Sequence, residues 1–264
     1  MIQALWTAGA GLISQQYNVD TIANNIANVD TTAFKRNTAH IEDMPYVYKL
    51  NPAIRQADNE GVLPHMGTGA RVVSSPKYFA QGPMQQTERN LDLGIDGTAF
   101  FAVTDGQGNV FYTRDGNFKL TETEGEDGQI HSYITTANGY WLLDTEGARI
   151  EIPAGAIEGD ISIDPSGAVM VEGAHIADIA LVEFTNPQAL EARGDNLYAV
   201  TDNVGPNYLT DGDSKVRQGF LEASNVDIAD EMARMIRAQR AYQLNARVLQ
   251  TADEMIGLAN SIRR

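Results

Sequence analysis

The 264-residue chain contains no cysteine. This absence excludes disulfide bonds, thiolate metal ligands and a cysteine nucleophile, but it leaves the cellular compartment open. No apolar run approaches the ~20 residues that a transmembrane helix needs. The first basic residue is Lys35, so we expect no cleaved secretory signal peptide, because such a peptide carries its positive charge ahead of its apolar segment.

Basic residues are also scarce, with 19 Lys and Arg against 35 Asp and Glu and a net charge of −16. Binding to nucleic-acid phosphates requires clustered Lys and Arg, and an anionic membrane surface attracts the same residues. In the C-terminal segment, basic residues alternate with apolar positions, which is typical of a solvated or subunit-facing helix stripe: Arg234, Arg237, Arg240 and Arg247. We therefore expect no nucleic-acid partner and no membrane insertion.

The sequence offers little chemistry. Gly67-Thr68-Gly69 lacks the lysine and the helix that follow a phosphate-binding loop. The acidic stretches 122–127 and 211–213 lack the ordered spacing of a calcium loop, so solvated turns are favoured. Four histidines show no spacing typical of a zinc site or a catalytic triad: His40, His65, His131 and His175. We expect no catalytic, cofactor-binding or metal site, although paired carboxylates in an acidic chain leave an enzyme open as an alternative.

The N-terminal segment carries apolar residues in alternating steps of three and four, which keeps them on one side of a helix. Asparagines at 24, 25 and 28 tolerate a left-handed cap, so the helix is predicted to stop near Asn28. The predicted stripe consists of Ile2, Leu5, Gly9, Leu12, Gln16, Val19, Ala23 and Ile26.

The C-terminal segment has the seven-residue spacing of a coiled-coil seam. Ser224 and Asp227 suggest a capping box, and the predicted helix runs from about 225 to 262, or roughly 55 Å. A long terminal helix more often packs on its own domain, but the matching stripe at the opposite end of the chain favours pairing of the two helices. The seam consists of Ile228, Met235, Tyr242, Leu249 and Ile256, with Met232, Ala246 and Ala252 between them.

Between the helices, alternating apolar residues and Asp-Gly turns predict strands from about 70 to 221, including a hairpin that turns at Asp115-Gly116. From Val29 to Met66, proline and glycine break every candidate element, which indicates an extended connector. The predicted fold class is α+β, with long terminal helices that pair as a coiled-coil-like core domain and a central, mainly β domain. The predicted divisions are 1–30 for the first helix, 31–69 for the connector, 70–222 for the β domain and 223–264 for the last helix.

Several runs of residues resemble the bacterial flagellar rod and hook proteins. Leu5-Trp6-Thr7-Ala8, Gln15-Gln16 and the run 22–36 resemble the N-terminal signature of that family. The C-terminal signature is matched at 224–227, 235–236, 239–242 and 251–255, and the β-domain motifs at 82–87, 91–97 and 112–118. The resemblance covers nearly the whole chain. The length of about 260 residues resembles that of the distal or the proximal rod members of the family. The N-terminal run and the segment 43–67 are most similar to the distal ones.

The chain departs from the family pattern in two signature positions. Thr32-Ala33-Phe34 stands where Asn or Pro followed by Gly and Phe is common, so we expect Ala33 to remove the freedom to adopt a positive φ there. Gly97-Thr98-Ala99-Phe100-Phe101 replaces the usual Gly-x-Gly-Phe-Phe. The acidic segment after Leu120 is a further departure.

The resemblance implies a structural subunit of the distal rod that has no cofactor, is not an enzyme, and polymerises helically into the drive shaft between motor and hook. It also implies a place in the flagellar basal body, reached through the flagellar type III export apparatus without a cleaved signal peptide and across the periplasm or cell wall. Further implied partners are the other rod and hook proteins and the outer-ring bushing proteins. Alternatives are a proximal rod or hook member, or a β-domain enzyme or ligand-binding protein acting on the cell wall.

The residues predicted for these roles form two sets. The predicted assembly interface is Ile2, Leu5, Leu12, Val19, Ile26, Ile228, Met232, Met235, Tyr242, Leu249 and Ile256. The predicted connector or hinge signature is Asn24, Asn25, Asn28, Phe34 and Lys35.

Overall fold

The structure is a computed structural model that describes residues 2–48, 65–124, 130–153, 155–200, 205, 207–208 and 214–262. Contacts divide the chain into two compact units. The helix unit comprises residues 1–27, 37–77 and 227–264, and the β unit comprises 28–36 and 78–226. This grouping splits the predicted connector 31–69 between the two units. The division proposed from the sequence stays a prediction.

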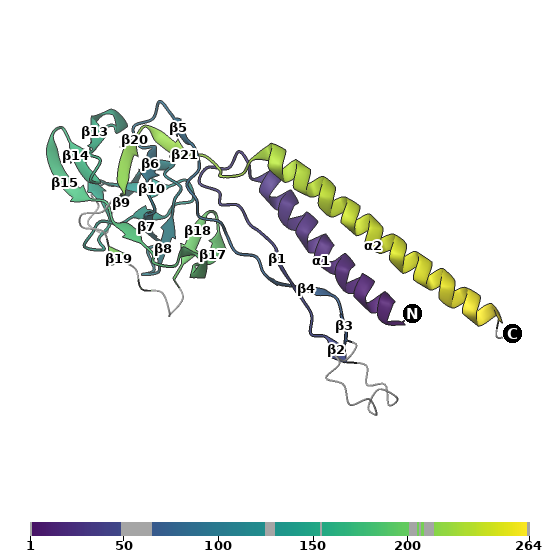
Figure 1. Cartoon of the computed structure of the whole chain (residues 1–264). Helices are drawn as coiled ribbons and strands as arrows, with labels where there is room; N and C mark the ends of the chain where they lie inside the picture. The colour runs from purple at the N-terminus through teal and green to yellow at the C-terminus, as the bar shows by residue number, and fades with distance from the viewer. Residues whose placement is uncertain are drawn as a thin grey trace. The chain divides into compact units, whose positions relative to one another are not determined.

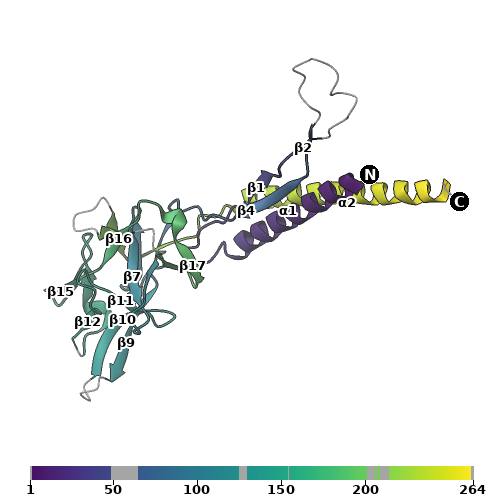
Figure 2. The ribbon, with the colours of Figure 1, turned by 90° about the horizontal axis from the view of Figure 1, so that it is seen from below.

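The helix unit is built around two long helices, α1 (Ile2–Ala27) and α2 (Ile228–Ile262), which lie side by side and run in opposite directions (Figures 1 and 2). A ribbon of β1 (His40–Asp43) and β4 (Ala70–Ser74) packs on α1, and β2 (Val47–Tyr48) and β3 (His65–Met66) pair farther along. Ser14 fixes this ribbon to the helix because its hydroxyl donates to the Ala70 carbonyl at 3.0 Å.

The start of α2 differs from the prediction. The Asp227 carboxylate accepts hydrogen bonds from the amides of Ala229 (2.8 Å) and Asp230 (3.3 Å), so Asp227 is the N-cap and the helix begins at Ile228. Ser224 lies in the β unit and accepts a hydrogen bond from the Val226 amide instead. The predicted capping box from Ser224 to Asp227 is therefore wrong, because the chain is still non-helical at these positions.

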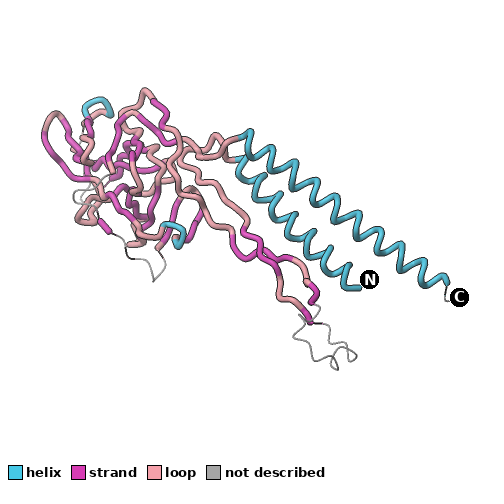
Figure 3. The backbone as a smooth tube through the Cα atoms, in the orientation of Figure 1, coloured by secondary structure: helices cyan, strands magenta, loops and turns pink. Residues whose placement is uncertain are grey.

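The β unit contains a ten-stranded antiparallel sheet within the described residues, together with smaller sheets (Figure 3). Its main path runs β12-β10-β11-β7-β8-β18-β17. The strands are β5 (Met84–Gln86), β6 (Leu93–Asp96), β7 (Phe100–Thr104), β8 (Val110–Thr113), β9 (Phe118–Glu124), β10 (Ile130–Thr136), β11 (Trp141–Leu142), β12 (Glu151–Ile152), β13 (Ile161–Ile163), β14 (Ala168–Val171), β15 (Ala174–Asp178), β16 (Leu181–Glu183), β17 (Glu191–Gly194), β18 (Leu197–Ala199), β19 (Asn207–Tyr208), β20 (Lys215–Gln218) and β21 (Phe220–Glu222). Short 3-10 helices in the described part of the chain include η2 (Glu158–Asp160) and η3 (Pro187–Ala189).

Strand β7 lies between two apolar cores. Phe101 and Val103 pack in the larger core, and Phe100 and Ala102 pack in the second one with Phe184. Successive residues of a strand point to opposite faces, so every residue of this strand is buried. Burial on both faces explains why the segment reads as a continuous apolar run.

The predicted hairpin at Asp115-Gly116 is wrong. Strand β8 pairs with β7 and β18, and β9 pairs with β10, so the two flanking strands do not pair with each other. Gly116 instead passes close to Leu93, whose amide donates to the Gly116 carbonyl at 3.0 Å. Of the acidic stretch 122–127, Glu122 and Glu124 belong to β9; residues 125–127 and the predicted turn 211–213 lie outside the described residues.

The α+β class is confirmed, with a helix at each end and a mainly β region between them. The two helices belong to one compact unit, whereas coiled-coil geometry between them stays a proposal. In the described part of the chain, no helix is long and apolar enough to cross a membrane.

Candidate functional site

The inner face of the helix pair is formed by residues that repeat in steps of four and three. On α2 these are Glu231, Met235, Ala238, Asn245, Leu249, Ala252 and Ile256, all buried or half-buried apart from the more exposed Tyr242 that continues the series. Asn245 lies against Gly11 of α1, where an added Cβ would come within 3.0 Å of its amide nitrogen. The helices therefore approach closely through small and polar residues as well as apolar ones.

The predicted interface residues fall into two groups in the helix unit. Ile228, Met232 and Tyr242 are exposed, while the others whose side chains are described are half-buried: Leu5, Leu12, Val19, Ile26, Met235, Leu249 and Ile256. The side chain of Ile2 lies outside the described residues. Contact between copies through these residues stays a prediction.

Sequence analysis missed a second set of apolar residues on the same helices. Trp6 and Ile13 are 74% and 71% exposed on α1, and Leu244 and Leu258 are 61% and 64% exposed on α2. A signal for them existed, because they also recur at helical spacing, but the predicted stripes took precedence over them. Both faces of each helix thus carry large apolar side chains.

In the helix unit, the buried Asn25 ties the end of α1 to two other segments. Its amide donates to the Asn37 carbonyl (2.8 Å) and its carbonyl accepts from the Asn37 amide (2.9 Å), as a strand pair would do. The same amide contacts the Glu231 carboxylate at 3.3 Å. Of the other predicted hinge asparagines, Asn24 is exposed, and Asn28 accepts from Thr31 in the β unit.

In the β unit, a buried charge cluster joins three residues that are distant in sequence: Lys35, Arg114 and Glu222. One oxygen of the Glu222 carboxylate accepts from the Lys35 ammonium at 2.5 Å and from the Gly82 amide at 2.7 Å. The other oxygen accepts from the Arg114 guanidinium at 2.9 Å. All three side chains are at most 1% exposed. Both oxygens of the carboxylate accept hydrogen bonds, so the cluster connects the segments that carry Lys35, Arg114 and Glu222.

The segments around the charge cluster are also held by backbone contacts. The Ala33 amide donates to the Glu222 carbonyl at 2.7 Å. The Asn225 side chain accepts from the Arg36 amide (2.8 Å) and donates to the Tyr78 carbonyl (2.7 Å). These residues flank the points where the chain passes from the β unit to the helix unit. Phe34, a predicted hinge residue that lies between Ala33 and Arg36 in the sequence, is buried, with 6% of its surface exposed.

Two pKa shifts follow from burial at the cluster. Desolvation, with Glu222 opposing it and Arg114 adding to it, lowers the pKa of Lys35 to about 8. Desolvation also raises the pKa of the Tyr198 hydroxyl. The cluster holds two cations and one carboxylate, so burial disfavours the excess positive charge.

Ala33 contradicts the expectation drawn from the sequence. Its φ is +55°, in the left-handed region, although it is not a glycine and is only 1% exposed. The hydrogen bond of its amide to Glu222 and its burial hold this conformation. A left-handed alanine costs roughly 1 to 2 kcal/mol, so the surrounding contacts offset local strain.

Ala33→Gly is expected to change the free energy of unfolding of the β unit by less than about 1 kcal/mol, because glycine relieves the strain of the positive φ while a buried methyl group is lost. Urea unfolding of the full chain, followed by Trp141 fluorescence in a Trp6→Phe background, measures this. The control is Ala102→Gly, which removes a buried methyl group from a strand and should lower the same free energy. Destabilisation of equal size by both changes would contradict the strain.

Metal and histidine chemistry is sparse in the structure. Among the described residues, no group of three or more His, Asp and Glu side chains gathers as metal ligands. His131 contacts Glu151, His175 contacts Asp178 at 2.8 Å, and His40 lies 3.6 Å from Glu42. The side chain of His65 lies outside the described residues.

The chain has two terminal helices in one unit, a strand-rich centre, and polar contacts close to the residues where it passes from one unit to the other. These are the features of a structural protein with helical ends. Three family models match the chain: "Flagella basal body rod protein" over residues 5–35, "Flagellar hook protein FlgE/F/G D1 domain" over 94–171, and "Flagellar basal body rod FlgEFG protein C-terminal" over 217–262. The chain belongs to the flagellar basal-body rod protein family, and its role is that of a structural rod subunit of the basal body.

Relatives match along their whole length. The flagellar basal-body rod protein FlgG of Borreliella burgdorferi is 38% identical over 100% of both chains. That of Caulobacter vibrioides is 36% identical over 99% of this chain and 100% of its own. The flagellar hook-basal body complex protein FlhP of Bacillus subtilis is 30% identical over 100% of both. The resemblance to the rod and hook family, distal rod members included, is confirmed.

Proposed function

We propose that the chain polymerises helically through its terminal helices into the distal rod, the drive shaft between motor and hook. The observation that carries this proposal is the separation of charge between the two units. The helix unit has ten acidic and ten basic residues, and the β unit has the remaining 25 acidic and nine basic ones. The whole net charge of −16 thus belongs to the β unit.

This separation favours self-association through the helices. Like charges on closely packed copies repel one another, and only the neutral unit avoids this cost. The same unit exposes large apolar side chains on α1 and α2, and such surfaces mark sites of protein association. In the proposed rod, the paired helices form the inner tube in coiled-coil-like contact, and the acidic β units form the outer layer.

The proposal extends to partners and route. Neighbours in the axis would be other rod and hook proteins, and the outer-ring bushing proteins would face the β units. The chain would leave the cell through the flagellar type III export apparatus without a cleaved signal peptide. A shaft needs rigid contacts and no reactive groups, so we propose no enzymatic activity. Electron microscopy of labelled basal bodies would separate the distal rod from the proximal rod and hook.

The double change Met235→Asp and Leu249→Asp is expected to abolish rod assembly and motility while leaving the β unit folded. Both residues are half-buried on the inner face of α2. A carboxylate at either position would be partly desolvated without a compensating hydrogen bond or ion pair, which costs free energy. Rods are scored by electron microscopy and the β unit by Trp141 fluorescence.

The control is Gln250→Asp, an exposed position on the same helix. It adds one exposed carboxylate, against the two half-buried ones of the double variant, and should leave rods intact. Normal rods from the double variant would contradict the proposed role of the paired helices as the inner tube.

A further inference from the structure

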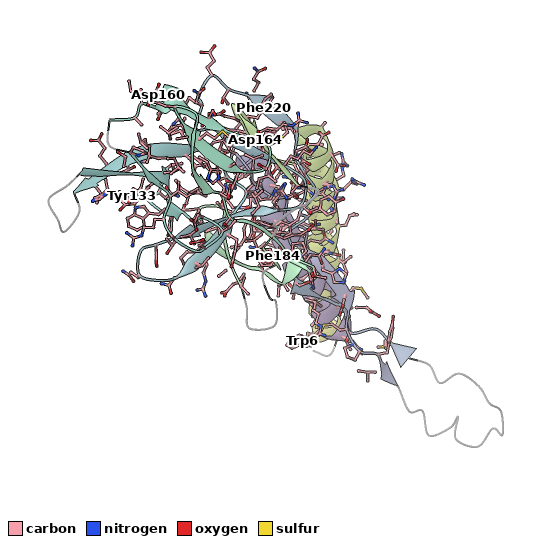
Figure 4. All side chains as sticks on the ribbon, turned by 90° about the vertical axis from the view of Figure 1, so that its left-hand side faces the viewer. Trp6, Tyr133, Asp160, Asp164, Phe184 and Phe220 are labelled. Atoms are coloured by element: carbon pink, nitrogen blue, oxygen red, sulfur yellow. The ribbon has the colours of Figure 1, made fainter. Side chains whose placement is uncertain are left out.

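Helix α1 carries an exposed apolar stripe that the helix pair does not cover. Trp6, Ile13 and Tyr17 are 74%, 71% and 42% exposed. At about 100° per residue, their side chains leave the helix within roughly 40° of one another and span about 17 Å of its length. Trp6, labelled in Figure 4, also borders a hollow of about 920 Å³ with Ile256 and Ala259. Because Ile256 belongs to the inner series of α2, the N-terminal end of the stripe adjoins the contact between α1 and α2 of the same chain.

Helix α2 carries a second exposed stripe in its C-terminal half. Leu244, Val248, Met255 and Leu258 are 61%, 49%, 56% and 64% exposed. They fall within roughly 80° around the helix and span about 21 Å, which matches the length of the stripe on α1. They lie away from the inner series that ends at Ile256, so pairing with α1 of the same chain leaves them uncovered.

Each stripe adjoins charged residues, and these charges are negative on α1 and positive on α2. On α1, Asp20 follows Tyr17 by three residues, and the negative end of the helix dipole lies just beyond. On α2, the exposed Arg237 and Arg240 precede Leu244. Within the described residues, Asp20 and Arg240 form no ion pair. Laid antiparallel, the two stripes match apolar against apolar and acid against base.

We infer that the α1 stripe of one copy packs antiparallel on the α2 stripe of a second copy. The two surfaces differ, so the contact is heterologous: each copy keeps one free stripe of each kind and adds another copy. A heterologous contact that does not close into a ring generates an open helical filament. This inference rests on the proposed function and specifies the contact by which the polymer grows, through residues other than those of the predicted seams.

The test joins two single-cysteine variants, Ile13→Cys and Val248→Cys, because the chain has no cysteine of its own. The two variants carry tags of different size. They are mixed and polymerised, or expressed together and isolated in basal bodies, and are then oxidised. A disulfide between one variant and the other, with few within either, is the expected result. Glu146→Cys on the β unit replaces Val248→Cys as the control and should give at least about tenfold less product.

Charge reversal provides a second readout. Asp20→Arg should reduce the pelleted, polymerised fraction several-fold, and Arg240→Asp in the same chain should restore most of it. Rods that form without the Ile13–Val248 disulfide, or with disulfides only between identical variants, would overturn the inference and leave the proposed polymer intact. A wild-type chain that never polymerises, alone or in basal bodies, would overturn the proposed function itself.

Discussion

Glu222→Gln is expected to lower the free energy of unfolding of the β unit by about 3 to 5 kcal/mol, because it leaves two buried cations without a carboxylate. Lys35 and Arg114 both reach Glu222, at 2.5 Å and 2.9 Å, and neither side chain is more than 1% exposed. For a unit of this size, the melting temperature should fall by about 6 to 20 °C. Urea and thermal unfolding in a Trp6→Phe background report this unit through Trp141.

Two controls separate the buried charge from charge in general. Asp96→Asn breaks an ion pair with Arg217 at 2.6 Å whose side chains are 53% and 43% exposed, so its cost should stay below about 1 kcal/mol. Lys35→Met added to Glu222→Gln removes one of the stranded cations, so the double variant should lose less than the sum of the single variants. Equal losses for Glu222→Gln and Asp96→Asn would show that the cluster contributes no more than a surface pair.

The cluster also shows where sequence analysis stops. Lys35 was predicted as a hinge residue from the family signature, but its partner Glu222 is 187 positions away and was not predicted. No local pattern distinguishes this glutamate from the other acidic residues of the chain. Only the fold brings the two together, since strands β5 and β21 pair and place Glu222 opposite Met84, near Gly82.

The helices were predictable because amphipathic periodicity is local. The existence of both helices followed from spacing alone. The hinge role predicted for Asn25 stays a prediction, and its hydrogen-bond partner Asn37 was not predicted. The choice of face was harder. Helix α2 carries apolar residues on its inner series and on the outer stripe from Leu244 to Leu258, and a sequence with two such series does not say which one meets α1.

The hairpin error has a physical cause at Gly116. Asp-Gly favours tight turns through a positive φ, but Gly116 is not among the residues of the described chain with a positive φ. Its lack of a side chain serves close approach instead. An ideal Cβ would lie 1.6 Å from the Leu93 carbonyl oxygen and 2.6 Å from its carbonyl carbon. Local turn chemistry and long-range backbone contact select the same residue type, and sequence alone does not separate them.

Gly116→Ala is therefore expected to cost about 3 kcal/mol or more, at the upper end of overpacking effects, because the atom in the way belongs to the backbone and not to a flexible side chain. Relief would require breaking the bond from the Leu93 amide to the Gly116 carbonyl and moving Leu93, a fully buried core residue. Unfolding of the full chain, followed through Trp141, measures the loss.

Gly159→Ala is the matched control for this change, because no atom lies within 4 Å of its added Cβ, its φ is not positive and it is exposed. It should change the free energy of unfolding by less than about 1 kcal/mol. A flexible turn at Gly116 would tolerate alanine as well as position 159 does. A large loss of unfolding free energy at position 116 alone would instead establish that the close contact with Leu93, a residue of the larger core of the β unit, requires glycine there.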